Sequence, residues 1–222
     1  MPKPRVKICC IASAEEARLA IECGASALGL VSEMPSGPGV IPEELIAEIA
    51  ARVPPPVATF LLTCRQDAGS IIAQQRRGRV NTLQLCDRVP PETYAALRAE
   101  LPGVSLVQVV HVTGGESFAE ALTVAPHVDA LLLDSGKPDL AVKELGGTGR
   151  THDWRVSRRI VEASPAPVFL AGGLRPENVA EAVAHVRPFG LDVCSGVRSE
   201  GRLDSEKLRR FFAALNHEES HL

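Results

Sequence analysis

Eight short runs of apolar, β-branched residues alternate with eight amphipathic stretches, and this alternation constrains the fold more than any other feature of the chain. The apolar runs occupy Arg5–Cys10, Ser26–Val31, Val57–Thr63, Val80–Leu85, Val104–Val112, Val128–Asp134, Pro167–Ala171 and Gly190–Cys194. Nearly all of them are continuously apolar rather than alternating, which is typical of parallel strands covered on both faces. The sequence therefore predicts a parallel sheet with helices packed against it.

The stretches between these runs have the apolar spacing of helices. They cover Ala14–Cys23, Pro42–Arg52, Asp67–Arg76, Pro91–Glu100, Glu116–Val124, Asp153–Ala163, Pro176–Val186 and Asp204–Leu215. Ile46, Ile49 and Ala50 illustrate the i, i+3, i+4 stripe that a helix turns toward a core. Ser13, just before the first stretch, is a candidate N-cap.

Eight strand–helix units share 222 residues, or about 28 residues per unit, which is close to the minimum for a (β/α)8 barrel. A doubly wound sheet is the alternative, but eight regular units without a long insertion favour closure. No stretch resembles a linker or a low-complexity tract. We expect the α/β class, with residues 1–222 forming a single (β/α)8 TIM barrel domain.

Composition excludes several classes of partner. The chain carries 24 Lys and Arg against 27 Asp and Glu, a net charge of −3, which argues against nucleic-acid binding because that needs a concentrated basic face. No apolar run is long enough to span a membrane, and the first ten residues lack the apolar segment of a signal peptide. Six cysteines without a CxxC pair indicate free thiols and a cytoplasmic location.

Three glycine-rich turns in the second half of the chain are candidates for a phosphate site. They are Gly146–Gly149, Ala171–Leu174 and Ser195–Val197. Active sites of (β/α)8 barrels lie at the C-terminal ends of the strands, and the loops after strands 7 and 8 commonly hold a phosphate group. Glycines there let backbone N–H groups approach an anion closely, so these turns predict a small phosphorylated ligand.

Cys9 and Asp134 form a plausible acid–base pair, because both fall at strand ends and a closed barrel would place them across one pocket. A strand-end cysteine is, taken alone, more often a small core residue. Lys7 shares the face of Cys9 by the two-residue period of a strand. We expect Lys7 to be the buried partner of a carboxylate in the barrel floor.

These motifs in this order resemble the phosphoribosylanthranilate isomerase family of tryptophan biosynthesis along nearly the whole chain. The segments that carry the resemblance are Lys7–Ile11, Gly24–Gly29, Gln84–Leu85, Leu132–Asp134, Gly146–Gly149 with Asp153–Trp154, Leu170–Asn178 and Asp192–Val197. The resemblance implies an Amadori rearrangement of N-(5'-phosphoribosyl)anthranilate with no metal and no organic cofactor. It assigns Asp134 as the general acid and Cys9 as the general base. It implies phosphate binding by Gly147, Gly149, Gly172, Gly173, Ser195 and Gly196.

The chain departs from the family pattern in three places. The family's Ser-Pro-Arg after strand 2, whose Arg is associated with the anthranilate carboxylate, is matched by Ser36–Gly39, which contains no Arg. Cys10 replaces a glycine that follows the catalytic cysteine, and Cys86-Asp87 replaces a His-Gly pair after Gln84. All three lie on the anthranilate side of the expected pocket. We expect Gln84 to bind substrate, and Arg65, just past strand 3, to replace the missing Arg.

Other interpretations stay open at this point. A diverged paralogue would keep the barrel and the phosphate site but take a different phosphorylated sugar conjugate, and a non-catalytic sensor would bind such a ligand without turnover. Five cysteines near strand ends, with His111, could also form a soft-metal site, but their spacing is not characteristic and we expect no metal. The related isomerase of histidine biosynthesis is expected to have a carboxylate where Cys9 stands. Oligomeric state is left open as monomer or homodimer.

Overall fold

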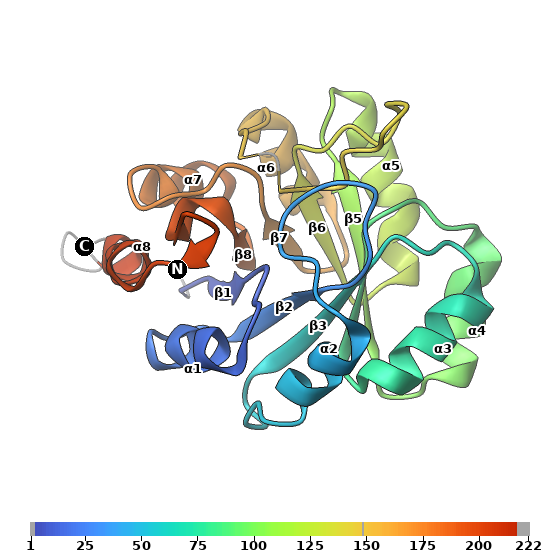
Figure 1. The fold of residues 1–222 in the computed structure, drawn as a ribbon. Helices are drawn as coiled ribbons and strands as arrows, with labels where there is room; N and C mark the ends of the chain where they lie inside the picture. Colours follow the sequence, from blue (N-terminus) through green and yellow to red (C-terminus); the bar gives the residue numbers. More distant parts are fainter. Residues whose placement is uncertain (1–2, 148, 217–222) are drawn as a thin grey trace.

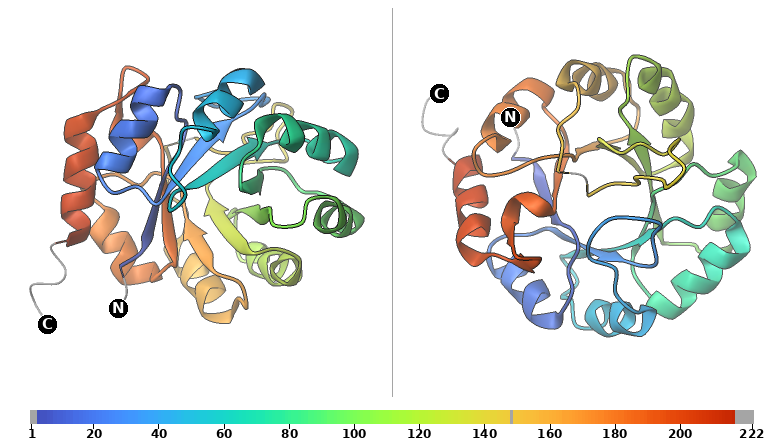
Figure 2. Two further views of the ribbon diagram at one scale, coloured as in Figure 1. Left: turned by 90° about the horizontal axis from the view of Figure 1, so that it is seen from below. Right: turned by 45° about the horizontal axis from the view of Figure 1, so that its top comes forward.

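The computed structural model describes residues 3–147 and 149–216, which form a closed barrel of eight parallel strands in the order β1 to β8 (Figures 1 and 2). The strands are β1 (Arg5–Ile8), β2 (Ala27–Val31), β3 (Ala58–Thr63), β4 (Thr82–Leu85), β5 (Ser105–His111), β6 (Ala130–Asp134), β7 (Val168–Leu170) and β8 (Gly190–Val193). Pairing of β1 with β8 closes the barrel and aligns Lys7 with Asp192. The prediction of a (β/α)8 barrel is confirmed, and the doubly wound alternative is excluded.

A helix follows each strand and packs outside the barrel (Figure 2). The helices are α1 (Ala14–Glu22), α2 (Glu43–Ala50), α3 (Ala68–Gly78), α4 (Pro91–Glu100), α5 (Glu116–Val124), α6 (Trp154–Ala163), α7 (Val179–Val186) and α8 (Ser205–Asn216). Side-chain caps begin four of them, because Ser13, Asp67, Asp153 and Asp204 each accept a hydrogen bond from a backbone N–H of the first turn.

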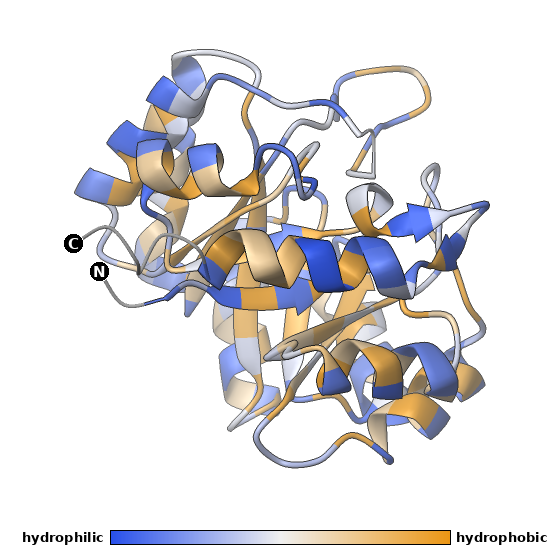
Figure 3. Cartoon of the chain, turned by 90° about the vertical axis from the view of Figure 1, so that its left-hand side faces the viewer, coloured by the Kyte–Doolittle hydropathy of each residue, from blue (hydrophilic) through white to orange (hydrophobic). Residues whose placement is uncertain are grey.

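Apolar side chains fill two separate layers. One lies between the strands and the helices and contains aliphatic residues such as Ile8, Leu61 and Leu133. The other fills the inside of the barrel, where Phe60 and Phe169 meet edge to face with ring centroids 6.1 Å apart. Figure 3 shows mainly hydrophobic strands and helices with both hydrophobic and hydrophilic bands. Leu145 and Ala171 continue the inner layer past the strand ends, and Lys7 is a buried polar residue within it, with its Nζ over the Phe60 ring.

The structure adds elements that the sequence did not predict. Short 3₁₀ turns, η1 (Ala125–His127) and η2 (Ser195–Val197), follow α5 and β8, and the strands β9 (Arg198–Ser199) and β10 (Arg202–Leu203) form a hairpin before α8. Helix α7 begins at Val179, three residues after the predicted start. Asn178 precedes it and bonds the backbone of Gly173 and Arg175, so the residues before α7 form a turn instead of helix. No helix among the described residues is long and apolar enough to cross a membrane.

Candidate active site

One cavity opens at the C-terminal end of the barrel. Residues from most of the strand ends line it: Cys9 and Cys10 after β1, Val31, Met34 and Ser36–Pro38 at and after the end of β2, Leu62 in β3, Gln84 and Cys86 around β4, Asp134 at the end of β6, Leu145–Gly147 and Gly149 in the loop after β6, Ala171–Leu174 after β7, and Asp192–Ser195 at and after the end of β8. This is the position that the fold uses for active sites. Cys9 and Asp134 therefore line the same cavity, with β8 and β7 between their strands.

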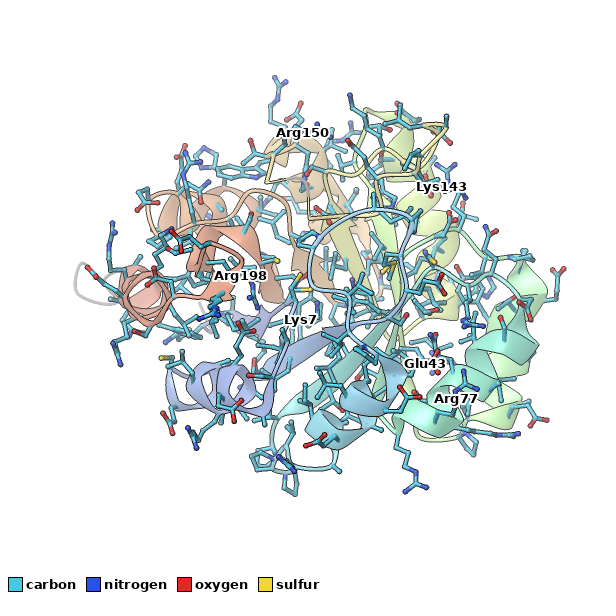
Figure 4. All side chains as sticks on the ribbon, in the orientation of Figure 1. Lys7, Glu43, Arg77, Lys143, Arg150 and Arg198 are labelled. Carbon is cyan, nitrogen blue, oxygen red and sulfur yellow. The ribbon has the colours of Figure 1, made fainter. Side chains whose placement is uncertain are left out.

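Cys9 lies directly above a buried ion pair. Lys7 is fully buried, and its Nζ is 2.8 Å from Oδ1 of Asp192. Burial alone would lower the pKa of Lys7, but the Asp192 carboxylate, with a smaller contribution from Cys9, raises it above the ordinary lysine value. A Cβ on Gly29 would lie 2.9 Å from Cys9 Sγ and 3.0 Å from Lys7 Nζ, so glycine is required beside these two atoms. The expected carboxylate partner of Lys7 is thus Asp192, and Figure 4 shows Lys7 in the middle of the barrel.

Asp134 is the buried carboxyl of the cavity. Burial raises its pKa, against the opposing effects of a 2.7 Å hydrogen bond from the Ser135 N–H and of His111 nearby. Gly146 and Gly172 pack against the carboxyl, since a Cβ on either would lie 2.7 Å or 3.2 Å from one of its oxygens. A carboxyl whose pKa is raised by burial holds its proton longer than an exposed one, which is the property of a general acid.

The glycine-rich turns lie in the part of the cavity next to β7 and β8. Gly147, Gly149, Gly172 and Gly173 all have positive φ, between 62° and 84°, a region that favours glycine. Gly149 approaches the Ser195 hydroxyl, because a Cβ on it would lie 3.5 Å from that oxygen. Within the described residues, the backbone N–H groups of Gly172, Gly173, Ser195 and Gly196 donate no hydrogen bond to the chain. Such unpaired N–H groups suit an anion.

Two loops close over this end of the barrel. The loop after β2 and the loop after β6 both reach across the strand ends in Figure 2. The Ser36 hydroxyl donates a 2.6 Å hydrogen bond to the Lys143 carbonyl, and Pro38 packs against Gly147. The substituted Ser36–Gly39 segment is therefore part of the cavity roof.

Of the two residues expected to bind substrate, Gln84 lines the cavity and Arg65 does not. Gln84 lines the cavity and is buried, and its Oε1 has no hydrogen-bond partner among the described residues. Arg65 does not line the cavity. Its Nη2 lies 3.6 Å from Oε1 of Glu43, whose other oxygen binds Arg77, and Figure 4 shows Glu43 and Arg77 together on the outer side of the barrel. Arg65 is therefore drawn to the carboxylate at the start of α2, and the expectation that it replaces the missing Arg has no support in this geometry.

Cys10 and Arg198 form a second set of contacts that sequence reasoning missed. Cys10 has φ 62°, where the family has glycine, and its Sγ is 2.7 Å from Sγ of Cys194. That hydrogen bond, together with Arg198, lowers the pKa of Cys194 although burial opposes the shift. The Arg198 guanidinium binds the carbonyls of Cys9 and Cys10 and the carboxylate of Glu16. These bonds hold the turn that carries the catalytic candidate Cys9.

Asp192 is the other residue that the sequence could have pointed to. It is a charged residue inside the apolar run of β8, between Leu191 and Val193, and it is the only carboxylate in that run. Among the described residues, no three His, Cys, Asp or Glu side chains are grouped as a metal site would require. Gly196, unlike Ser195, does not line the cavity, since it packs against the Leu174 carbonyl.

The fold and the cavity define a (β/α)8-barrel enzyme with a site at the C-terminal ends of its strands. A family model for N-(5'-phosphoribosyl)anthranilate isomerase matches residues 6–214. The chain is 36% identical to an N-(5'-phosphoribosyl)anthranilate isomerase of Methanocella arvoryzae over 208 residues, which are 94% of this chain and 95% of the relative. The chain belongs to the N-(5'-phosphoribosyl)anthranilate isomerase family.

Solved structures agree with this assignment. The crystal structure of phosphoribosyl anthranilate isomerase from Thermus thermophilus has a TM-score of 0.81 and 31% identity, covering 96% of this chain and 98% of the other. A phosphoribosyl anthranilate isomerase in complex with reduced 1-(o-carboxyphenylamino)-1-deoxyribulose 5-phosphate has a TM-score of 0.76 and 27% identity, covering 96% and 99% of the two chains. The relatives thus share the whole barrel with this chain.

Proposed function

We propose that this chain isomerises N-(5'-phosphoribosyl)anthranilate to the 1-deoxyribulose 5-phosphate conjugate in tryptophan biosynthesis. The observation that carries the proposal is that the Cys9 thiol and the Asp134 carboxyl line one cavity in a member of this family. Burial raises the pKa of the Asp134 carboxyl. An Amadori rearrangement moves protons within one molecule. One acid and one base therefore suffice, and no metal or organic cofactor is needed.

Asp134 is the proposed general acid. Its carboxyl protonates the ribose ring oxygen, and the ring opens to a Schiff base. The raised pKa that burial causes favours the protonated form that this step uses. Cys9 is the proposed base that takes the C2' proton, and the resulting enolamine tautomerises to the ketose. Lys7 supplies a positive charge close to Cys9, since a Cβ on Gly29 would touch both side chains.

The phosphate is proposed to bind the glycine-rich turns, through residues 147, 149, 172, 173, 195 and 196. Support comes from the unpaired N–H groups of Gly172, Gly173, Ser195 and Gly196. Phosphate binding far from the reacting carbons contributes remote binding energy that holds C1' and C2' between Cys9 and Asp134. Gln84 is proposed to contact the arylamine part of the substrate through its unpaired Oε1.

The setting follows from the same features. All six cysteines are free, which suits a reducing compartment, and we propose a cytoplasmic enzyme that acts on a small phosphorylated molecule. A single-domain barrel working as a monomer or a homodimer is the simplest assembly for such a site, because all the proposed groups come from one chain.

Turnover of N-(5'-phosphoribosyl)anthranilate by purified Cys9→Ser and Asp134→Asn variants tests the proposal. We expect each variant to lose about 10³-fold or more in kcat, the scale of removing a general acid or base. Cys64→Ser is the matched control, since this thiol follows β3 outside the cavity and bonds the Glu33 carbonyl. A wild-type protein that leaves the substrate unchanged, or that fails to restore growth without tryptophan to a strain lacking the isomerase, contradicts the proposal.

A further inference from the structure

The part of the cavity lined by β2, β3 and β4, together with Leu145 of the loop after β6, is apolar. Its wall consists of Val31, Met34, Leu62, Cys86 and Leu145, and four of these five side chains are buried. The polar atom in this wall is Oε1 of Gln84, which is buried without a partner and can accept one hydrogen bond. The group attached to the substrate nitrogen would lie here once the phosphate occupies the turns. An aromatic ring fits such a wall, and an N–H beside it fits the Gln84 oxygen.

Among the described residues, no cationic side chain lines this end of the cavity. Among the described residues that line the cavity there is no Lys, Arg or His, whereas the carboxylates of Asp134 and Asp192 both line it. The cations around the mouth are engaged with carboxylates: Lys143 with Asp87, Arg150 with Glu144 and Arg198 with Glu16. Figure 4 shows Arg198 at the left, Arg150 at the top and Lys143 at the right of the molecule. A carboxylate on the ligand would thus lose water without gaining an ion pair.

The roof also excludes a long side chain at the position after Pro38. Gly39 has φ 83°, and a Cβ on it would lie 2.4 Å from the Cβ of Cys10 and 2.9 Å from its Cα. Cys10 is held there by its contacts with Cys194 and with the Pro38 carbonyl. The side chain of Cys10 therefore occupies the space that a side chain at residue 39 would need. Gly39 and Cys10, two departures from the family pattern, thus fit each other sterically, and neither supplies a cation.

We propose that this cavity recognises the amine part of its substrate without its carboxylate, and that the enzyme also isomerises N-(5'-phosphoribosyl) conjugates of neutral arylamines. The inference rests on the proposed function, because it uses the same acid, base and phosphate turns. The reaction is the same isomerisation: the C2' proton leaves to Cys9, a proton is added at C1', and no co-reactant is consumed. The residues that set this range are Cys10, Gly39 and the apolar wall.

The test compares kcat/KM of the wild-type protein for N-(5'-phosphoribosyl)anthranilate and for N-(5'-phosphoribosyl)aniline, which lacks the carboxylate. We expect the aniline conjugate to be used as well as the anthranilate conjugate or better. A site built to bind a polar substrate group rejects the analogue without it by roughly 10⁴-fold. A preference of more than about tenfold for the anthranilate conjugate would therefore overturn the proposal.

The outcomes separate the two claims. Turnover of the anthranilate conjugate alone contradicts the inference and leaves the proposed function intact, whereas turnover of neither conjugate contradicts both. A variant extends the test: Met34→Arg adds a cation to the wall and should change the ratio of the two kcat/KM values about tenfold in favour of the carboxylate. Met34→Gln, of similar length without charge, should leave this ratio near its wild-type value. Equal ratios in both variants would mean that charge at this wall does not govern selection, and would contradict the proposal.

Discussion

Lys7 and Asp192 form a buried ion pair at the floor of the cavity, with the Lys7 ammonium fully buried and also 5.3 Å from the centre of the Phe60 ring. Replacing Lys7 by Met leaves the Asp192 carboxylate without a partner. We expect this variant to lose about 3 kcal/mol of unfolding free energy, because breaking a buried pair strands a charge. The double variant Lys7→Met with Asp192→Leu should recover much of that loss. Urea unfolding of the three proteins measures both, and a double variant less stable than Lys7→Met would contradict this account.

Asp134 has a cost to stability that follows from its raised pKa. The folded state holds the proton on this carboxyl more tightly than the unfolded chain does, so stability decreases as the pH rises from the ordinary aspartate pKa of 3.8 through the raised value. Asp134→Asn removes the ionisable group and keeps an oxygen for the Ser135 N–H. We expect the inactive variant to be roughly 1 kcal/mol more stable than wild type at pH 7. Melting curves between pH 4 and pH 8 test this, since the difference should shrink toward pH 4.

The segment between β8 and α8 holds the loop that carries Cys9. Arg198, at the start of β9, binds Glu16 of α1 and the carbonyls of Cys9 and Cys10, and Glu16 also accepts the Leu203 N–H. Arg198→Ala removes the bonds that Arg198 makes to Glu16 and to the carbonyls of Cys9 and Cys10, and we expect a loss of about 2 kcal/mol. Arg202→Ala, an exposed residue of β10, is the control and should cost under about 0.5 kcal/mol. Equal melting temperatures for both variants would show that the hairpin does not hold the Cys9 turn.

The same segment marks the limit of prediction from the sequence. The eight strands and eight helices can be predicted from apolar periodicity and capping residues. Strands buried on both faces are continuously apolar, whereas helices buried on one face carry an apolar stripe. The hairpin at residues 198–203 has no such pattern, since two-residue strands bury almost nothing. The role of Arg198 depends on contacts with Glu16, 182 residues away in the chain, and no local pattern reports such a contact. Arg65 is a second example. Its position after β3 predicts that it lies at the rim of the barrel, but it does not predict that its guanidinium lies beside the Glu43 carboxylate.

At the scale of the whole molecule, the closed sheet makes the barrel unfold as one unit, so that a ligand bound at the glycine-rich turns stabilises all of it. Hydrogen bonding runs without an edge from β1 through β8 and back to β1, so the structure predicts cooperative unfolding. A ligand that binds only the folded barrel adds about 2.7 kcal/mol to the free energy of unfolding at a concentration a hundred times its Kd. Such a ligand therefore raises the melting temperature of the whole barrel. Inorganic phosphate is the simplest probe of the turns after β6, β7 and β8.

We expect phosphate to raise the melting temperature of wild type in a concentration-dependent way, and to do so equally in Cys9→Ser, whose changed group packs beside Lys7 and Gly29 instead of the proposed cradle. Ser195→Asp should lose the shift, because it adds a negative charge beside Gly149 and the unpaired N–H group of Gly196. Ser70→Asp, at the exposed start of α3, introduces the same charge far from the cavity and should keep the shift. Chloride at matched ionic strength separates binding from salt effects. A shift that persists in Ser195→Asp would place the phosphate site elsewhere on the barrel.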